Sequence, residues 1–104
     1  MMKEYIICAA IYYNDGAPDT QVHKPKNITT GVVITGRRHC NCYETLAMIY
    51  PDYKYKTHQT EGFLTSTNRF VDRYEAYTIA KREGQLFSGM IHDDTPSLTS
   101  EELY

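Results

Sequence analysis

Several features are missing from this 104-residue sequence, and each absence argues against a class of protein. No run approaches the roughly 20 apolar residues that a membrane-spanning helix needs, and the apolar run near the start is too short for a signal peptide. The three cysteines, an odd number, argue against a disulfide framework and favour a reducing compartment. The net charge of −2 argues against binding of duplex nucleic acid, which requires many phosphates to be neutralised. We therefore expect a cytosolic protein with no membrane or duplex nucleic-acid partner.

The sequence also lacks the motifs of common hydrolases and nucleotide-binding enzymes. There is no paired His-x-Thr motif of a phosphodiesterase, no Gly-x-Ser-x-Gly turn and no Walker-type phosphate loop. His39, Cys40 and Cys42 invite a metal or a cysteine–histidine interpretation, but their spacing does not fit a zinc site, and neighbouring residues on a helix point apart. The sequence therefore predicts no catalytic residue, no metal site and no cofactor, and it places Cys42 in the core.

Tryptophan is absent, whereas tyrosine occurs ten times. A tyrosine ring is apolar and its hydroxyl is polar, which suits both interfaces and stacking on flat ligands. The simpler alternative is that most of the tyrosines line a half-solvated sheet and a dimer surface. Residues 1–104 are predicted to form a single domain, small enough that oligomerisation would help its stability.

The strands are predicted from short runs of β-branched and aromatic residues. Asn14, Asp15 and Gly16 indicate a turn after the first run, and the strand at 31–35 is expected to pair antiparallel with it. The segments 17–28 and 52–61 are polar and are predicted to be loops. The four predicted strands span residues 5–13, 31–35, 62–65 and 69–71.

Two helices are predicted, at 39–49 and 73–83. In the first, Cys42, Leu46 and Ile49 recur at helical spacing, supported by Tyr43, and Pro51 ends the pattern. In the second, Asp72 and Glu75 have the spacing of a capping box, and Gly84 is the expected left-handed stop. The predicted fold is therefore α+β: a small antiparallel sheet of about four strands with two helices packed on one face.

Basic residues stand where the second predicted strand gives way to the first helix. A helix N-terminus offers unpaired N–H groups and about half a positive charge, and arginine matches phosphate oxygens two at a time. This first group is a candidate phosphate-binding site. The alternative is a solvated helix start, or ion pairs with some of the thirteen acidic residues. The candidate residues are Arg37, Arg38, His39 and Asn41.

A second group surrounds the start of the second helix. An exposed Phe63 could stack on a purine, a contact worth roughly 1–3 kcal/mol, while polar neighbours contact its edges. The alternative, which the strand pattern favours, places Phe63 in the core and Leu64 outward. The candidate residues of this group are Phe63, Thr65, Asn68, Arg69 and Arg73.

The order of these motifs resembles a known family. The segments are 36–41 (Gly-Arg-Arg-His-Cys-Asn), 59–76, 79–80 (Ile-Ala), 84–85 (Gly-Gln) and 100–104 (Ser-Glu-Glu-Leu-Tyr). In this order they resemble the first-described type of Thoeris anti-defence proteins, which are small and phage-encoded. The resemblance implies a sponge that binds, without cleaving, the cyclic ADP-ribose isomer that a bacterial TIR-domain protein makes as an alarm signal. It also implies assembly from dimers with pockets between protomers, and separate sites for cyclic di- and trinucleotides in some relatives.

Cyclic ADP-ribose carries a pyrophosphate, a purine and riboses. Such a ligand calls for arginines on the phosphates, an aromatic ring on the purine and Asn or Thr on the sugar hydroxyls, which matches the two groups of candidates. We therefore expect a non-enzymatic homo-oligomer in the host cytosol that sequesters a cyclic nucleotide. The rival interpretations are a small nucleotide hydrolase that uses His39 and a phage structural or protein-interaction module.

Overall fold

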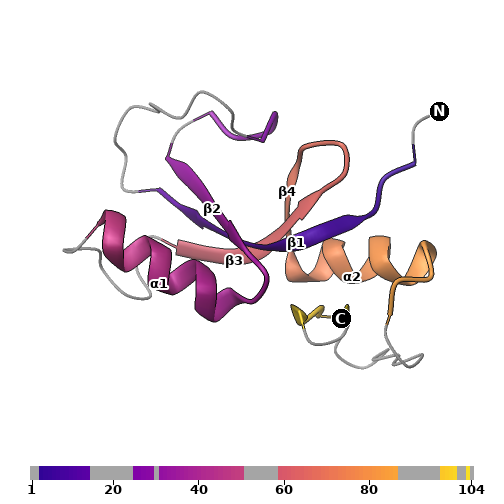
Figure 1. The fold of residues 1–104 in the computed structure, drawn as a ribbon. Coiled ribbons are helices and arrows are strands. Elements are labelled where there is room, and N and C mark those ends of the chain that lie inside the picture. Colours follow the sequence, from indigo (N-terminus) through magenta and orange to yellow (C-terminus); the bar gives the residue numbers. More distant parts are fainter. Residues whose placement is uncertain are drawn as a thin grey trace.

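The computed structural model describes residues 3–14, 25–29, 31–50, 59–86, 97–100 and 103 (Figure 1). They form a four-stranded antiparallel sheet, ordered β2-β1-β3-β4, and two helices, which confirms the predicted α+β class. Among these residues, no helix has the length and apolarity needed to cross a bilayer. The elements are β1 (Ile6–Tyr13), β2 (Val32–Gly36), α1 (His39–Ile49), β3 (Gln59–Thr65), β4 (Phe70–Asp72) and α2 (Arg73–Arg82).

Both helices pack on the same face of the sheet, as predicted. Cys42 and Leu46 of α1 are fully buried against this face, and Ile49 is an exception at 54% exposure because it is the last residue of the helix. Four residues of α2 are buried in the same core: Ala76, Tyr77, Ile79 and Ala80. Apolar side chains of the three longer strands and β4 complete this main core.

The predicted bounds of β3 and β4 were wrong by a few residues. β3 begins at Gln59, so residues 59–61 belong to the strand and not to a loop. Their backbones pair with Tyr13, Tyr12 and Ile11 of β1, and this pairing determines the strand although the side chains are polar. β4 spans residues 70–72 instead of 69–71. The predicted turn residues Asp15 and Gly16 lie outside the described residues. So do residues 17–24 and 52–58 of the two predicted loops.

Local capping signals set the limits of α2. The carboxylate of Asp72 accepts the backbone N–H of Glu75 at 2.8 Å, and Gly84 has a positive φ of 68°, both as predicted. The helix ends at Arg82, one residue earlier than predicted. The second half of the predicted capping box was wrong, because the Glu75 carboxylate accepts a hydrogen bond from Arg69 at 2.9 Å.

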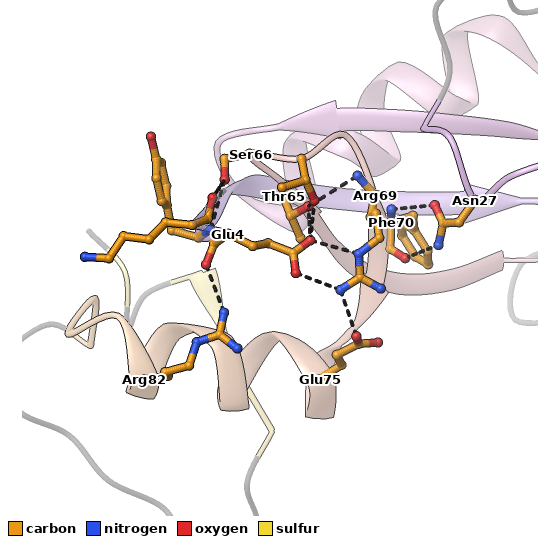
Figure 2. Close-up of polar contacts among 11 residues, drawn as sticks. Glu4, Asn27, Thr65, Ser66, Arg69, Phe70, Glu75 and Arg82 are labelled. Carbon is orange, nitrogen blue, oxygen red and sulfur yellow. Dashed lines mark hydrogen bonds and ion pairs between the residues drawn. The ribbon is translucent and has the colours of Figure 1, made fainter. Parts of the chain in front are cut away.

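The opposite face of the sheet carries a smaller apolar cluster of Ala10, Ile28, Val33 and Phe70. The segment 25–29 lies along the outer edge of β4. There the side-chain amide of Asn27 donates to the carbonyl of Phe70 at 2.7 Å and accepts its N–H at 2.9 Å (Figure 2). Asn27 therefore occupies the hydrogen-bonding groups that an edge strand would otherwise offer to another chain.

Candidate functional site

The N-termini of the two helices meet near the middle of the sheet. Figure 1 shows α1 and α2 running away from this point in opposite directions. Arg73, the first residue of α2, places Nη2 3.4 Å from Nδ1 of His39, the first residue of α1. The structure thus joins one member of each candidate group. The positive ends of two helix dipoles lie together here, in addition to the charge of Arg73.

The contacts of His39 determine its protonation. The side chain is buried, and Nε2 lies 2.8 Å from the carbonyl oxygen of Gly62. A carbonyl can only accept, so Nε2 carries the proton. Nδ1 faces the Arg73 guanidinium, which can only donate, so we assign the tautomer in which Nε2 carries the proton and Nδ1 accepts. The ring also packs edge-on against Phe63, with centroids 5.1 Å apart.

A carboxylate balances the charge of Arg73. Nη2 of Arg73 donates to Oε1 of Glu61 in a short ion pair, and Oε2 of Glu61 accepts the hydroxyl of Tyr43 at 2.6 Å. Burial raises the pKa of Glu61, but the hydrogen bonds from Arg73 and Tyr43 outweigh it and leave the pKa below its ordinary value. We call His39, Tyr43, Glu61 and Arg73 the helix-start cluster. It joins α1, β3 and α2.

The rest of the first candidate group lies beside this cluster. Arg37 and Arg38 occupy the two positions between β2 and α1, with Arg37 exposed and Arg38 half-buried. Asn41 is exposed, and its Oδ1 accepts the backbone N–H of Arg38 at 3.1 Å, so it acts as a local cap for the start of α1. The four members of the group therefore form a contiguous turn at the N-terminus of α1.

Phe63 is fully buried in the main core, while Leu64 is only half-buried on the other face. Of the two alternatives, the structure thus shows the core position, and the expectation of an exposed ring that stacks on a purine was wrong for Phe63. Strand alternation correctly gave Phe63 and Thr65 the same face. That face is the one the helices cover, and this buries both side chains.

Arg69 and Thr65 belong to a different cluster, built around Glu4 (Figure 2). Arg69 holds the Glu4 carboxylate with two hydrogen bonds of 2.8 Å, from Nε and Nη2, and Nη2 also donates to Glu75. The hydroxyls of Thr65 and Thr67 donate to the same carboxylate. Hydrogen bonds, first of all from Arg69, lower the pKa of Glu4 to about 2, and Glu4 in turn raises the pKa of Arg69.

Asn68 lies in the turn between β3 and β4 and has a φ of 62°. Its backbone N–H donates to the carbonyl of Thr65 at 3.0 Å, and its carbonyl accepts from Lys26 at 2.8 Å. Asparagine tolerates this left-handed conformation better than most residues, so the turn alone accounts for its identity. The second candidate group is thus divided between two clusters. Arg73 belongs to the helix-start cluster, whereas Arg69 and Thr65 bind the carboxylate of Glu4.

The sequence did not predict a role in either cluster for Glu61, Tyr43 or Glu4. Glu61 was placed in a loop, although alternation back from Phe63 would have put both on one face. Tyr43 was taken only as support for an apolar helix face. Glu4 carried no local signal, because its partner Arg69 is 65 residues away in sequence.

The described residues include no group of three or more His, Cys, Asp or Glu side chains placed to hold a metal ion. Cys42 is fully buried, as predicted, with Sγ 3.7 Å from the carbonyl oxygen of Ala9. Burial, together with the neighbouring thiols of Cys8 and Cys40, raises the pKa of Cys42 to about 12. The thiol is therefore a poor nucleophile near neutral pH.

Comparison with known protein families gives a match that covers most of the chain. A protein-family model described as phage T4 y16D protein matches residues 5–104, which is nearly the whole chain. No curated protein and no solved structure shows significant similarity.

Proposed function

Because the chain belongs to the phage T4 y16D protein family, we propose that it acts in the cytosol of the infected host. There it binds a cyclic nucleotide immune signal and sequesters it without cleavage. The ligand class is a cyclic ADP-ribose isomer, with cyclic oligonucleotides as a possible second class. Neither duplex nucleic acid nor a membrane is part of this function.

The contact between His39 and Arg73 carries the proposal. Two helix N-termini and the Arg73 guanidinium bring positive charge to one place, and Arg37 and Arg38 directly precede His39 in the sequence. A pyrophosphate is the group of the proposed ligand that such a place binds best, through charge-assisted hydrogen bonds from a planar guanidinium and from backbone N–H groups. The Nδ2 donor of Asn41, whose Oδ1 caps the start of α1, is our candidate to bind a sugar hydroxyl.

The purine requires another aromatic ring now that Phe63 is assigned to the core. Tyr74 follows Arg73 in the first turn of α2 and is 62% exposed. We propose it as the stacking residue, either within one chain or across the interface of a homo-oligomer built from dimers. A pocket completed by a second protomer would also explain why a small protein retains so many tyrosines.

The state of His39 supports sequestration without cleavage. Both of its ring nitrogens are engaged, Nε2 with the Gly62 carbonyl and Nδ1 with Arg73, so the ring holds no available lone pair for general-base catalysis. The buried thiol of Cys42 is likewise no accessible nucleophile. A protein that only needs to hold its ligand requires neither group to react.

Recovery of the ligand separates this function from its rivals. The protein is incubated with an equimolar cyclic ADP-ribose isomer, filtered to remove free ligand, and heated to release what it bound. We expect the retained fraction to contain the intact isomer. A linear product would indicate a nucleotide hydrolase instead. An isomer that passes entirely into the filtrate would favour a protein-interaction module.

A further inference from the structure

The helix-start cluster contains its own ion pair. Glu61 supplies a negative charge to the positive charge of Arg73, and Tyr43 donates a hydrogen bond to the same carboxylate. The Glu61 carboxylate accepts from Nη2 of Arg73, which the proposed function assigns to a phosphate. The Glu61 carboxylate therefore binds the Arg73 guanidinium, which is the strongest hydrogen-bond donor that the proposed function requires.

Arg73 is held in place independently of Glu61. Its Nη1 donates to the carbonyl of Leu98 at 2.6 Å, and its Nη2 contacts His39. The backbone N–H of Leu98 donates back to the carbonyl of Arg73 at 3.0 Å, and the Leu98 side chain is fully buried. If the carboxylate moved away, these contacts would keep the guanidinium in its present position.

Glu61, in contrast, is able to move. Its side chain is 34% exposed, and among the described residues its carboxylate contacts, from Arg73 and Tyr43, are made by side chains rather than by the backbone. The carboxylate is attached to the strand by a flexible stem. Rotation of that stem toward solvent would break two hydrogen bonds and leave the backbone pairing of β3 unchanged.

We infer that Glu61 occupies the position of a ligand phosphate, and that an anionic ligand binds by displacing its carboxylate from Arg73. This inference rests on the proposed function and concerns how binding at that site is regulated. The Glu61 carboxylate competes with anions for Arg73, and weakly binding anions do not displace it. A multivalent pyrophosphate, which can bind the guanidinium and the helix N-termini together, displaces the carboxylate more readily than a single phosphate or chloride does.

The inference makes a quantitative prediction. If the paired state of Glu61 is favoured about tenfold, only about one molecule in ten is open to ligand, and the apparent affinity is lowered by that factor. Glu61→Gln keeps the shape and the hydrogen-bonding capacity but removes the charge. We therefore expect it to bind inorganic pyrophosphate about tenfold more tightly than wild type. Tyr43→Phe, which removes one restraint on Glu61, should give a smaller gain.

Calorimetric titration with inorganic pyrophosphate, and separately with a cyclic ADP-ribose isomer, tests the inference. The control is Glu44→Gln, which makes the same charge change at an exposed position of α1 and should bind within twofold of wild type. Circular dichroism confirms that each variant is folded. If Glu61→Gln does not fold, Tyr43→Phe decides the matter by the same comparison.

The outcomes separate this inference from the proposed function. Suppose that Glu61→Gln binds pyrophosphate more tightly than wild type, and that neither wild type nor any variant binds the isomer. This result supports the displacement of Glu61 and rules out a cyclic ADP-ribose isomer as the ligand. Isomer binding that is equal in wild type and Glu61→Gln overturns the displacement and leaves the function in place. Pyrophosphate binding by Glu61→Gln that is no tighter than wild type, including no measurable binding by either, also overturns the displacement.

Discussion

Replacing Gly62 with alanine is expected to lower the free energy of unfolding by about 3 kcal/mol, the upper end of the usual cost of overpacking. A Cβ at this position would overlap the carbonyl oxygen of Val71 and lie 2.7 Å from a ring carbon of Phe70. The first of these atoms belongs to the backbone of the adjacent strand and cannot rotate away. Relief therefore requires β3 and β4 to separate. That movement would also shift the Gly62 carbonyl, which fixes His39.

The matched control for this substitution is Gly84→Ala. Its Cβ would meet no atom within 4 Å, so only the positive φ of 68° opposes it. We expect a cost of about 1 kcal/mol, from the left-handed backbone alone. Urea unfolding monitored by circular dichroism measures both variants. Equal destabilisation by the two substitutions would show that β4 does not pack over Gly62 as described.

Replacing Arg69 with alanine is expected to lower the free energy of unfolding by about 2 kcal/mol at pH 7. The value is smaller than the pKa shift of Glu4 alone would give, because solvent screens part of the ion pair. Arg69 makes two hydrogen bonds to Glu4, whose side chain is only 16% exposed. Without the guanidinium, that carboxylate keeps the donors Thr65 and Thr67 among the described residues. Arg82→Ala is the control, because Arg82 contacts the backbone carbonyl of Glu4 rather than its carboxylate, pairs with its neighbour Glu83 and is 54% exposed. It should cost less than about 0.5 kcal/mol.

The same ion pair predicts how stability depends on pH. The pKa of Glu4 is about 2 in the folded protein and 4.5 ordinarily, so the unfolded chain binds more protons between these values. The contribution of Glu4 is therefore complete above about pH 4.5 and is lost as the pH falls toward 2. Unfolding free energies measured at intervals from pH 7 to pH 2.5 should show this decline in wild type. A decline just as steep in Arg69→Ala would contradict the assignment.

The helices could be predicted from the sequence because their signals are local. The apolar spacing from Cys42 to Leu46 gave the limits of α1, and Asp72 with Gly84 gave those of α2 to within one residue. β3 was partly missed because Gln59, Thr60 and Glu61 are polar. They form a strand through backbone pairing with β1, a long-range interaction that side-chain composition does not reveal.

The candidate site was predictable only in part, for a related reason. Basic residues at two strand-to-helix junctions can be recognised in the sequence, and the structure brings His39 and Arg73 together. The carboxylates that balance the arginines are fixed by the tertiary fold. Nothing near Arg69 in sequence indicates Glu4. The burial of Phe63 likewise depends on which face of the sheet the helices cover, which alternation along one strand cannot specify.

The central claim is that the meeting point of the two helices holds the phosphates of a cyclic nucleotide. The most direct test is calorimetric titration of wild type and Arg73→Ala with a cyclic ADP-ribose isomer, with Arg82→Ala as the control. We predict saturable binding to wild type and Arg82→Ala. For Arg73→Ala we expect a loss of about 100-fold, since two charge-assisted hydrogen bonds are worth about 3 kcal/mol together. Equal affinity in wild type and folded Arg73→Ala would contradict the claim.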